Sequence, residues 1–309
     1  MHLVLVLNVE PQVLVVGHDA SSIAEAVALA GEGDTIELPP GRYVEAVTVT
    51  GDVHIVAPEG GVEWRTRHEG ERALTVTGNA SVTGVDFVDR GGVHVEGGAL
   101  AIVDTDFAAL SGTDGGAIRV DGGGRIDVMD SRFWGNAATR GADIFAQSAL
   151  VHVEGGLSCY AAAGEGAAIW AEDSLVSTVG YAVSGAQVER GAAVEALGSG
   201  ELAMRDVSLV GIEGDGVLAT KATIWNGLFA GVRGAGWSAN ADVEFTLDLD
   251  TAKEAGFVDA EVCSAEALAL RADSVAVDSG HPDIRDADDS RSDVGAYDGP
   301  ARRTLWANR

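Results

Sequence analysis

The sequence predicts an all-β fold in which one chain coils into a parallel β-helix of three sheets, with about 25 residues in each rung. Three observations predict it: similar segments recur at a nearly constant spacing, apolar residues alternate in short bursts, and 42 of the 309 residues are glycine. Self-similarity at this period is the signature of a solenoid. We therefore expect one continuous core and not several independent domains.

The repeats are clearest in the middle of the chain. Four segments open alike, namely GGAIRVDGG from Gly115, GADIFAQSA from Gly141, GAAIWAEDS from Gly166 and GAAVEALGS from Gly191. Their matching apolar positions, spaced by 26, 25 and 25 residues, are Ile118, Ile144, Ile169 and Val194. Val93 extends the series backwards and Val217 extends it forwards, with weaker similarity at both ends, as is usual for terminal repeats.

Within a unit the apolar residues alternate with period two. One unit has Ile118 and Val120, then Ile126 and Val128, then a third burst that ends at Phe133. This period indicates strands with one buried face. Coiling the chain stacks equivalent strands in parallel and buries that face in a common interior. The tight corners between strands account for the glycine content, because they require positive φ.

A short helix over residues about 20–31 is expected to cap the N-terminal end of the coil. Its apolar positions at helical spacing are Ile23, Ala26, Val27 and Ala30. Ser22 and Glu25 form a capping-box pattern, and Gly31 is expected to end the helix. A helix with one polar face suits this place, since the open end of a solenoid must be shielded from water.

The charge of the chain restricts its partners. Acidic residues outnumber basic ones 48 to 20, which makes the net charge −28. Such a field repels phosphate backbones and anionic membrane surfaces, so we expect no nucleic-acid binding. It also disfavours polyanionic polysaccharides unless cations or a local basic patch intervene. No apolar run approaches the roughly 20 residues of a membrane span, so no membrane insertion is expected.

The two cysteines, Cys159 and Cys263, exclude a disulfide-rich scaffold and a Cys₄ zinc site. They could form one bridge, but the sequence favours two unpaired thiols. The first residues, MHLVLVLNVEP, contain a five-residue apolar run that is too short for a signal peptide as it stands. The compartment is therefore left open by this part of the chain.

Both ends of the chain resemble one superfamily. Gly33–Val49, GDTIELPPGRYVEAVTV, resembles the opening of right-handed parallel β-helix proteins of the pectate-lyase-like superfamily. Leu270–Pro300 resembles the closing segment of many bacterial surface β-helix proteins, with Val275 where proline is usual and Asp289 where glycine is usual. The resemblance implies a right-handed coil and a bacterial surface or secreted protein. It does not imply one activity, because the superfamily holds lyases, hydrolases, epimerases, adhesins and inert stalks.

The domain organisation follows from these two ends. Residues 1–251 are expected to form the β-helix domain with its helical cap. Residues 252–309 are expected to form a C-terminal cap and tail that pack on the helix.

Two pairs of aromatic residues are candidate ligand-binding positions. Phe145 and Trp170 fall in one outward column, and Trp134 and Tyr160 follow the third strand of adjacent rungs. Rungs are neighbours about 4.8 Å apart, so each pair is expected to form a surface on which a sugar ring could stack. The alternative, slightly favoured, is that segment 252–309 folds back and buries one of the pairs.

Carboxylates near the third strand are candidate catalytic residues. Asp106 lies in an outward column with Asp86 and Arg132, and Asp130 is close in sequence. The resemblance implies possible roles for Asp106, Asp130 and Arg132, because related lyases use carboxylates with an Arg or Lys base and related hydrolases use clustered Asp residues. The alternative is stronger: Asp at strand ends caps turns and solvates an acidic surface. The NTD, GHG and RIK segments of polygalacturonases are also absent.

A calcium site is a weaker expectation. Asp286 and Asp288 begin a run that resembles the start of a calcium loop, but the expected Gly at position six and Glu at position twelve are missing. Aspartates that bond to their own turn explain the run equally well. No other cofactor is expected.

These observations favour a non-catalytic β-helix, a scaffold or a glycan- or protein-binding module of a bacterial envelope or extracellular protein. The alternative is a lyase, hydrolase or epimerase that acts on an acidic or neutral polysaccharide along the groove of the third strand. The oligomeric state is not determined by the sequence. A trimeric tailspike is disfavoured, because such a trimer needs long exposed apolar sides on each chain, and a chain of net charge −28 is not expected to present them.

Overall fold

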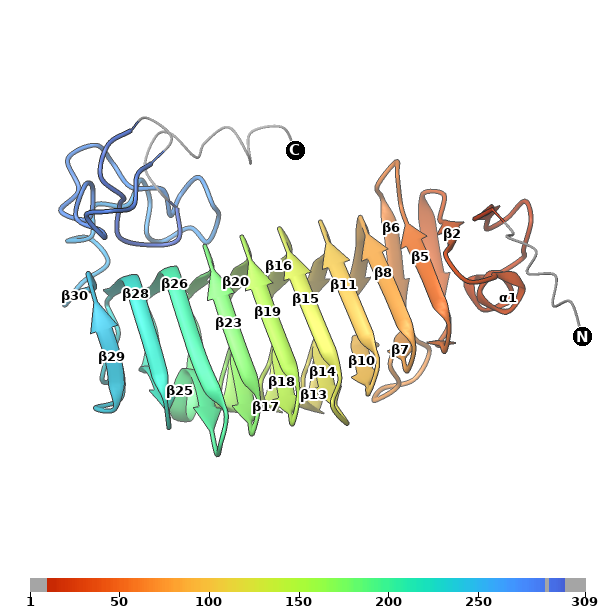
Figure 1. The fold of residues 1–309 in the computed structure, drawn as a ribbon, viewed down its shortest axis with the longest axis horizontal. Coiled ribbons are helices and arrows are strands. Elements are labelled where there is room, and N and C mark those ends of the chain that lie inside the picture. Colours follow the sequence, from red (N-terminus) through yellow and green to blue (C-terminus); the bar gives the residue numbers. More distant parts are fainter. Residues whose placement is uncertain (1–9, 287–288, 298–309) are drawn as a thin grey trace, which may run out of the picture.

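The computed structural model describes residues 10–286 and 289–297. The chain forms an all-β, right-handed parallel β-helix of about eight turns, as predicted (Figure 1). Strands that are equivalent in successive rungs pair in parallel, so each position of a rung generates one row of strands along the coil.

The row of longest strands faces the viewer in Figure 1, and we call it the long row. After the short strand β1 (Val13–Val15), it consists of β2 (Asp34–Glu37), β5 (Asp52–Val56), β8 (Asn79–Thr83), β11 (Ala99–Val103), β15 (Arg125–Met129), β19 (Leu150–Glu154) and β23 (Leu175–Val179). The short row follows it in each rung, with β3 (Gly41–Val44), β6 (Val62–Arg65), β9 (Val85–Val88), β12 (Asp106–Ala108), β16 (Arg132–Trp134), β20 (Leu157–Cys159) and β24 (Ala182–Ser184). Near the C-terminal end, β26 (Glu201–Val210) and β28 (Ala222–Ala230) each run through both rows, and β29 (Ala241–Glu244) and β30 (Leu247–Leu249) complete them.

Two further rows complete the rung. The corner row contains β13 (Ser111–Asp114), β17 (Ala137–Arg140) and β21 (Ala162–Glu165). The back row contains β4 (Val47–Val49), β7 (Leu74–Val76), β10 (Val93–Glu96), β14 (Ile118–Asp121), β18 (Ile144–Gln147) and β22 (Ile169–Glu172). The long strands β25 (Gln187–Leu197) and β27 (Glu213–Ala219) run through both of these rows. The sequence predicts three strands in each unit. The structure has a short fourth strand in some rungs, which forms the corner row.

The predicted register is confirmed in the back row. Ile118 pairs with Ile144, Ile144 with Ile169 and Ile169 with Val194, and all four side chains are buried. A one-residue slip would turn every one of these side chains to the outside, so the alternation fixes the pairing.

Stacked aromatic rings fill the interior behind the short row. Successive ring centroids are 5.4, 5.2 and 5.0 Å apart along Trp64, Phe87, Phe107 and Phe133. All four side chains are fully buried. Because each ring lies on the equivalent ring of the next rung, this column extends the hydrophobic core along the coil axis.

The N-terminal cap is the helix α1 (Ile23–Leu29), which lies at one end of the coil (Figure 1). Ser22 Oγ accepts a hydrogen bond from the backbone N–H of Glu25, as expected of an N-cap. The Glu25 carboxylate accepts from the backbone of Ser21 and not from that of Ser22, so the predicted capping box is shifted by one residue. Among the described residues, no helix is long and apolar enough to span a membrane.

The bend between the corner row and the back row depends on glycine. Gly141 and Gly166 occupy it with φ of 59° and 56°. A Cβ at Gly141 would lie 2.2 Å from the carbonyl oxygen of Ile144, and one at Gly166 would lie 2.6 Å from Cβ of Trp170. Only glycine fits here, because both the backbone angle and the space exclude a side chain.

The chain after β30 folds back over the outer face of the short row (Figure 1). We call its described part, 252–286 and 289–297, the C-terminal segment. It buries outward-facing apolar residues of β20, β24, β26 and β28 under a second hydrophobic cluster that includes Phe257, Cys263 and Leu268. Backbone N–H groups of Gly295 and Ala296 donate to the Asn226 carbonyl and to Ser208 Oγ. These contacts fix the segment against the coil.

Candidate functional site

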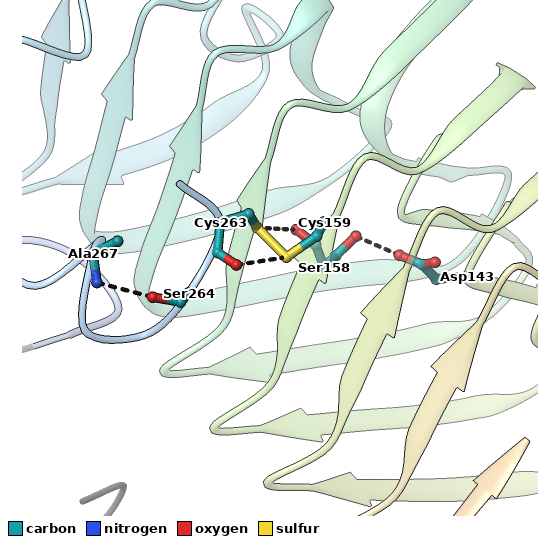
Figure 2. The surroundings of a disulfide bond; sticks show 6 residues. All are labelled: Asp143, Ser158, Cys159, Cys263, Ser264 and Ala267. Carbon is teal, nitrogen blue, oxygen red and sulfur yellow. Dashed lines mark hydrogen bonds between the residues drawn. A yellow bond between two sulfur atoms is a disulfide. The ribbon is translucent and has the colours of Figure 1, made fainter. Parts of the chain in front are cut away.

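A disulfide joins the C-terminal segment to the coil. Cys159 of β20 is bonded to Cys263, with their Cα atoms 5.9 Å apart (Figure 2). The expectation of two unpaired thiols was wrong. The residues are 104 positions apart, and they meet only because the segment folds back across the short row. Figure 2 also shows Ser158, the neighbour of Cys159, pointing the other way, into the coil.

A cleft of about 400 Å³ lies beside this disulfide, between the C-terminal segment and the short row. The coil contributes one wall, formed by Asp106, Phe107, Ala108, Arg132, Trp134, Leu157 and Cys159. The segment contributes the other, formed by Cys263, Ser264, Ala265, Glu266 and Tyr297. Two residues predicted as catalytic and one predicted to bind a ligand therefore share one cavity.

Trp134, which lines the cleft, forms an exposed aromatic pair with Tyr160. Their side chains are 49% and 42% exposed, and their ring centroids lie 5.1 Å apart at an interplanar angle of 80°. The pair is adjacent as predicted, but Trp134 pairs in register with Cys159, and Tyr160 follows it with a left-handed φ of 57°. The C-terminal segment leaves both rings accessible. The surface is therefore one ring face with a second ring edge-on, and not two parallel faces.

Asp106 and Arg132 form an ion pair inside the cleft. They pair in register across β12 and β16, and Arg132 Nε donates to Asp106 Oδ1 over 2.8 Å while Nη2 donates to Oδ2. The hydrogen bond to Asp106 raises the pKa of the Arg132 guanidinium above its usual value, against the effect of burial. Such a two-pronged contact orients both groups, so their outer edges form a rigid polar rim.

Asp86 extends this column by one rung. It pairs in register with Asp106, and Glu63 pairs with it on the other side, which places three carboxylates on successive strands. Burial, followed by repulsion from Asp106, raises the pKa of Asp86 to about 6, whereas the Arg132 guanidinium acts to lower it. The outward column placed Asp86 beside Asp106, but only its half-buried position in the structure singles it out as a titrating group.

Asp130 does not join the cleft. It occupies the turn between β15 and β16 with a φ of 49°, and its backbone N–H donates to the Glu154 carbonyl. Asp104 occupies the same turn one rung earlier, with φ of 51°. Asp tolerates left-handed backbone better than most residues, so the turn-forming interpretation explains both positions. The predicted grouping of Asp130 with Asp106 and Arg132 is not formed among the residues that line the cavity.

Phe145 and Trp170 stack in register, with centroids 4.9 Å apart and planes 5° from parallel, but they are not exposed. Their side chains are 1% and 4% accessible. The Arg140 guanidinium covers both rings, 4.9 Å from the Phe145 centroid and 4.5 Å from that of Trp170. The prediction of a sugar-stacking surface at this pair was therefore wrong, and the cover is an arginine of the corner row and not the C-terminal segment.

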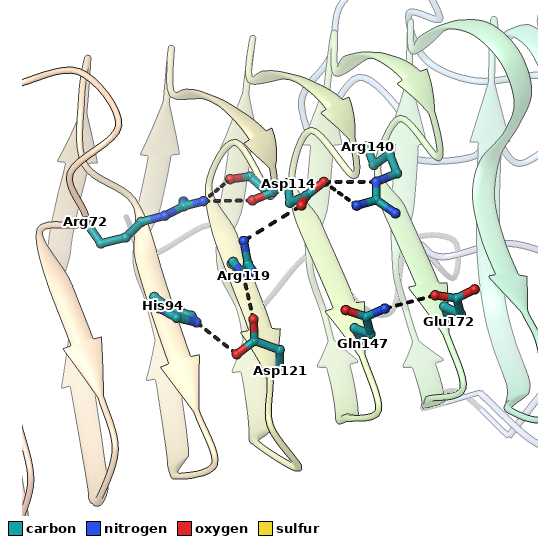
Figure 3. A network of polar contacts seen from close by, with 9 residues as sticks. Arg72, His94, Asp114, Arg119, Asp121, Arg140, Gln147 and Glu172 are labelled. Carbon is teal, nitrogen blue, oxygen red and sulfur yellow. Dashed lines mark hydrogen bonds and ion pairs between the residues drawn. The ribbon is translucent and has the colours of Figure 1, made fainter.

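Ion pairs hold Arg140 in place. Its Nη2 lies 2.8 Å from Asp114 Oδ1, and Arg119 lies between Asp114 and Asp121 (Figure 3). Arg72 reaches the same corner and donates to the carbonyl oxygens of Asp114 and Gly115, and burial lowers its pKa to about 10. The charged groups of this network are paired with one another or with backbone carbonyls, so the network stabilises the bend of the coil.

A polar group lies inside the coil behind the disulfide. Asp143 is fully buried, accepts a hydrogen bond from Asn136 Nδ2 over 2.9 Å and bonds to Ser158 Oγ. Burial raises its pKa to about 7. No sequence pattern marked Asp143, because an Asp after a turn glycine gives no sign of facing inward.

The calcium expectation falls on the edge of the described chain. Asp286 lies in a turn in which its backbone N–H donates to the Ser290 carbonyl, and Asp288 is outside the described residues. Within residues 10–286 and 289–297, no group of three or more His, Cys, Asp or Glu is arranged to hold a metal ion.

Comparisons with known proteins identify the fold. The structure is similar to the crystal structure of pectate lyase Pel9A, with a TM-score of 0.57 and 13% sequence identity, over 93% of this chain and 96% of that chain. No protein-family model matches the sequence, and no curated protein matches it. At this identity the likeness concerns the architecture and not the chemistry. The chain therefore has the pectate-lyase-like right-handed parallel β-helix fold.

Proposed function

We propose that this chain is a non-catalytic glycan-binding module of a bacterial envelope or extracellular protein, and that the cleft beside Trp134 binds the sugar. The observation that carries the proposal is the exposed indole of Trp134 in a cavity whose rim is a fixed Asp106–Arg132 pair. A large aromatic side chain exposed in a concave site, beside oriented polar groups, is a favourable arrangement for a sugar.

The two halves of the cleft suit the two faces of a pyranose ring. The C–H face can stack on the Trp134 indole, with the Tyr160 ring edge-on beside it. Hydroxyl groups at the ring edge can donate to Asp106 and accept from Arg132, both of which lie on strands and keep their positions. Each ring contributes about 1 kcal/mol, and a hydrogen bond to a charged group such as Asp106 or Arg132 contributes about 2 kcal/mol more, so together they support weak binding, roughly millimolar.

The charges at the cleft favour a neutral or cationic glycan. Asp106 and Arg132 compensate each other, whereas Glu266 on the opposite wall and Asp86 on the next rung add negative charge. The net charge of −28 acts in the same direction. A polyuronate would be repelled by both the site and the whole molecule.

The disulfide supports an extracytoplasmic location. Bonds such as Cys159–Cys263 form and persist in oxidising compartments, and they are rare where thiols are kept reduced. Because Cys263 also lines the cleft, an oxidising environment would keep the binding site intact.

The test compares two exposed tryptophans. Binding of neutral, amino and uronic oligosaccharides is measured by calorimetry for the unmodified chain, for Trp134→Ala and for Trp225→Ala, whose indole is exposed elsewhere. We expect Trp134→Ala to weaken binding about fivefold without loss of stability, and Trp225→Ala to leave binding unchanged. Equal binding by all three proteins, or no binding to any glycan, would overturn the proposal.

One observation favours a second function, that of a polysaccharide-active enzyme. A carboxyl group with a pKa raised to about 6 next to a second carboxylate is the pairing that acid–base hydrolysis uses. If Asp86 donates a proton to a glycosidic oxygen, depolymerisation should fall as pH rises through about 6 and should disappear in Asp86→Asn. If the unmodified chain releases no product at any pH between 4 and 8, the enzymatic alternative is rejected and the glycan-binding module stays the proposed function.

A further inference from the structure

We propose that a second copy of this chain packs on the long row, over a groove at the start of β19 and β23, to form a two-fold symmetric dimer. This site lies on a different face from the sugar-binding cleft, and its argument does not depend on the proposed function.

The groove has a volume of about 440 Å³ and an apolar floor. Leu150 and Leu175 line it as register partners on adjacent strands, and their side chains are 42% and 54% exposed. A single exposed leucine is ordinary in a folded protein. Two neighbouring exposed leucines in a groove form an apolar patch, and its contact with water is unfavourable in free energy. In this respect the groove differs from the rest of the long row, where outward positions are mostly polar.

The column that holds the leucines is complementary to itself. In register along the coil it reads Arg125, Leu150, Leu175, Glu201. A two-fold axis parallel to the strands, between β19 and β23, reverses this order in the facing copy. Leu150 then meets Leu175 of the second copy, and Arg125 meets its Glu201. Such a self-complementary patch is the requirement of an isologous interface.

The neighbouring column obeys the same symmetry. It reads Asp127, His152, Ser177, Ala203, so the axis places His152 opposite Ser177 of the second copy. An imidazole and a hydroxyl form a hydrogen bond readily, and the chain already makes one on this row, where His54 Nδ1 lies 2.8 Å from Ser81 Oγ. The same axis places Asp127 opposite Ala203, where the Asp127 carboxylate keeps its bonds to Arg125 of its own copy. At the centre of the interface, the two columns therefore place leucine on leucine and His152 on a hydroxyl group.

The charge around the groove is locally balanced. Arg125 bonds to Asp127 over 2.8 and 2.9 Å, and Lys221 bonds to Glu201 over 2.8 Å, so these four groups sum to zero. In a chain of net charge −28, a balanced face is where two copies repel each other least. Since Arg125 and Glu201 keep their own partners, docking joins two ion pairs into a four-charge network across the interface.

The first experiment measures the oligomeric state by sedimentation velocity over a range of protein concentrations. We expect the unmodified chain to dimerise, and Leu150→Asp and Leu175→Asp each to weaken the dimer at least tenfold. Leu29→Asp, at an exposed leucine of the distant α1, is the matched control and should dimerise as the unmodified chain does. Circular dichroism of each variant verifies that the fold is retained.

The second experiment exchanges the charges. Arg125→Glu and Glu201→Arg should each weaken the dimer, and the double variant should restore it, because the reversed column is again complementary to itself. A monomer at every concentration, a dimer that survives both leucine substitutions, or a double variant no better than the singles would overturn the proposal. If the monomeric protein instead binds a glycan that protects Leu150 and Leu175, the groove is a sugar site and the dimer is rejected.

Discussion

Cys159 of the short row is covalently bonded to Cys263 of the C-terminal segment, and both residues line the cleft. The bond therefore fixes one wall of the candidate site to the other. It also closes a loop that includes the last rungs of the coil, so it constrains much of the C-terminal half of the protein.

The double variant Cys159→Ala, Cys263→Ala should lower the free energy of unfolding by about 2–5 kcal/mol, because a cross-link across roughly 100 residues restricts the unfolded chain strongly. Urea denaturation measures the change, and glycan binding should weaken in parallel as the cleft wall loosens. The unmodified chain under reducing conditions should behave in the same way. Identical unfolding curves with and without reductant would contradict this view of the bond.

Ile169→Asp should open the coil at its centre. Ile169 is fully buried between Ile144 and Val194, so the substitution places an unpaired carboxylate in the apolar interior. The expected loss is several kcal/mol, about 3–5, whereas Ile169→Val should cost only about 1 kcal/mol. Gln187→Asp, on an exposed position of β25, controls for the added charge. A melting temperature for Ile169→Asp equal to that of the unmodified chain would show that the register is wrong.

Asp143 should make the stability of the protein depend on pH. Its pKa is raised by burial from 3.8 to about 7, so the folded chain keeps a proton that the unfolded chain releases. Its stabilising contribution is complete below about pH 4 and is lost as the pH rises through about 7. In Asp143→Asn, the free energy of unfolding should fall less between pH 4 and pH 7 than in the unmodified chain. Parallel curves for the two proteins would show that Asp143 does not titrate in this range.

Two substitutions should move the pKa of Asp86 in opposite directions. Removing the guanidinium in Arg132→Ala should raise it above about 6, since Arg132 lowers the pKa. Removing the carboxylate in Asp106→Asn should lower it, since Asp106 raises the pKa. Carbon-detected NMR titration of the Asp86 side chain measures both, with Arg205→Ala as a distant control. Shifts of the same sign in the two variants would refute the assigned electrostatics.

Arg140→Ala should expose the buried ring pair. The Arg140 guanidinium lies over Phe145 and Trp170. Its removal should make the Trp170 indole accessible to acrylamide, so acrylamide should quench tryptophan fluorescence more strongly in the variant than in the unmodified chain. The lost contacts should cost about 1–2 kcal/mol, because the cation–π contact is largely desolvated. Arg42→Ala removes a guanidinium from an exposed ion pair with Glu63 and should change neither property. Unchanged quenching in Arg140→Ala would mean that another group covers the rings.

The column of buried aromatic side chains shows which features of the fold can be predicted from the local sequence pattern. Phe107 and Phe133 could be placed in the interior because period-two alternation decides which face a side chain occupies. The repeat then aligns equivalent positions, so the contact of Phe145 with Trp170 was also predictable. Whether an outward ring meets water was not, because this depends on residues from other rows. Arg140 stands on the corner row, on the other side of the bend, and the distance it spans is set by the shape of the rung.

The sequence by itself determined the coil: its rung length, its register at Ile118, Ile144, Ile169 and Val194, and the helix that caps it. These features follow from alternation and repetition, which act between residues that are near in sequence or separated by one rung. Only the tertiary structure decided the Cys159–Cys263 bond, the cleft beside Trp134 and the raised pKa of Asp86. Each of these depends on how the C-terminal segment or a neighbouring strand excludes water, and no periodic pattern encodes a contact between a repeat and a segment that does not repeat.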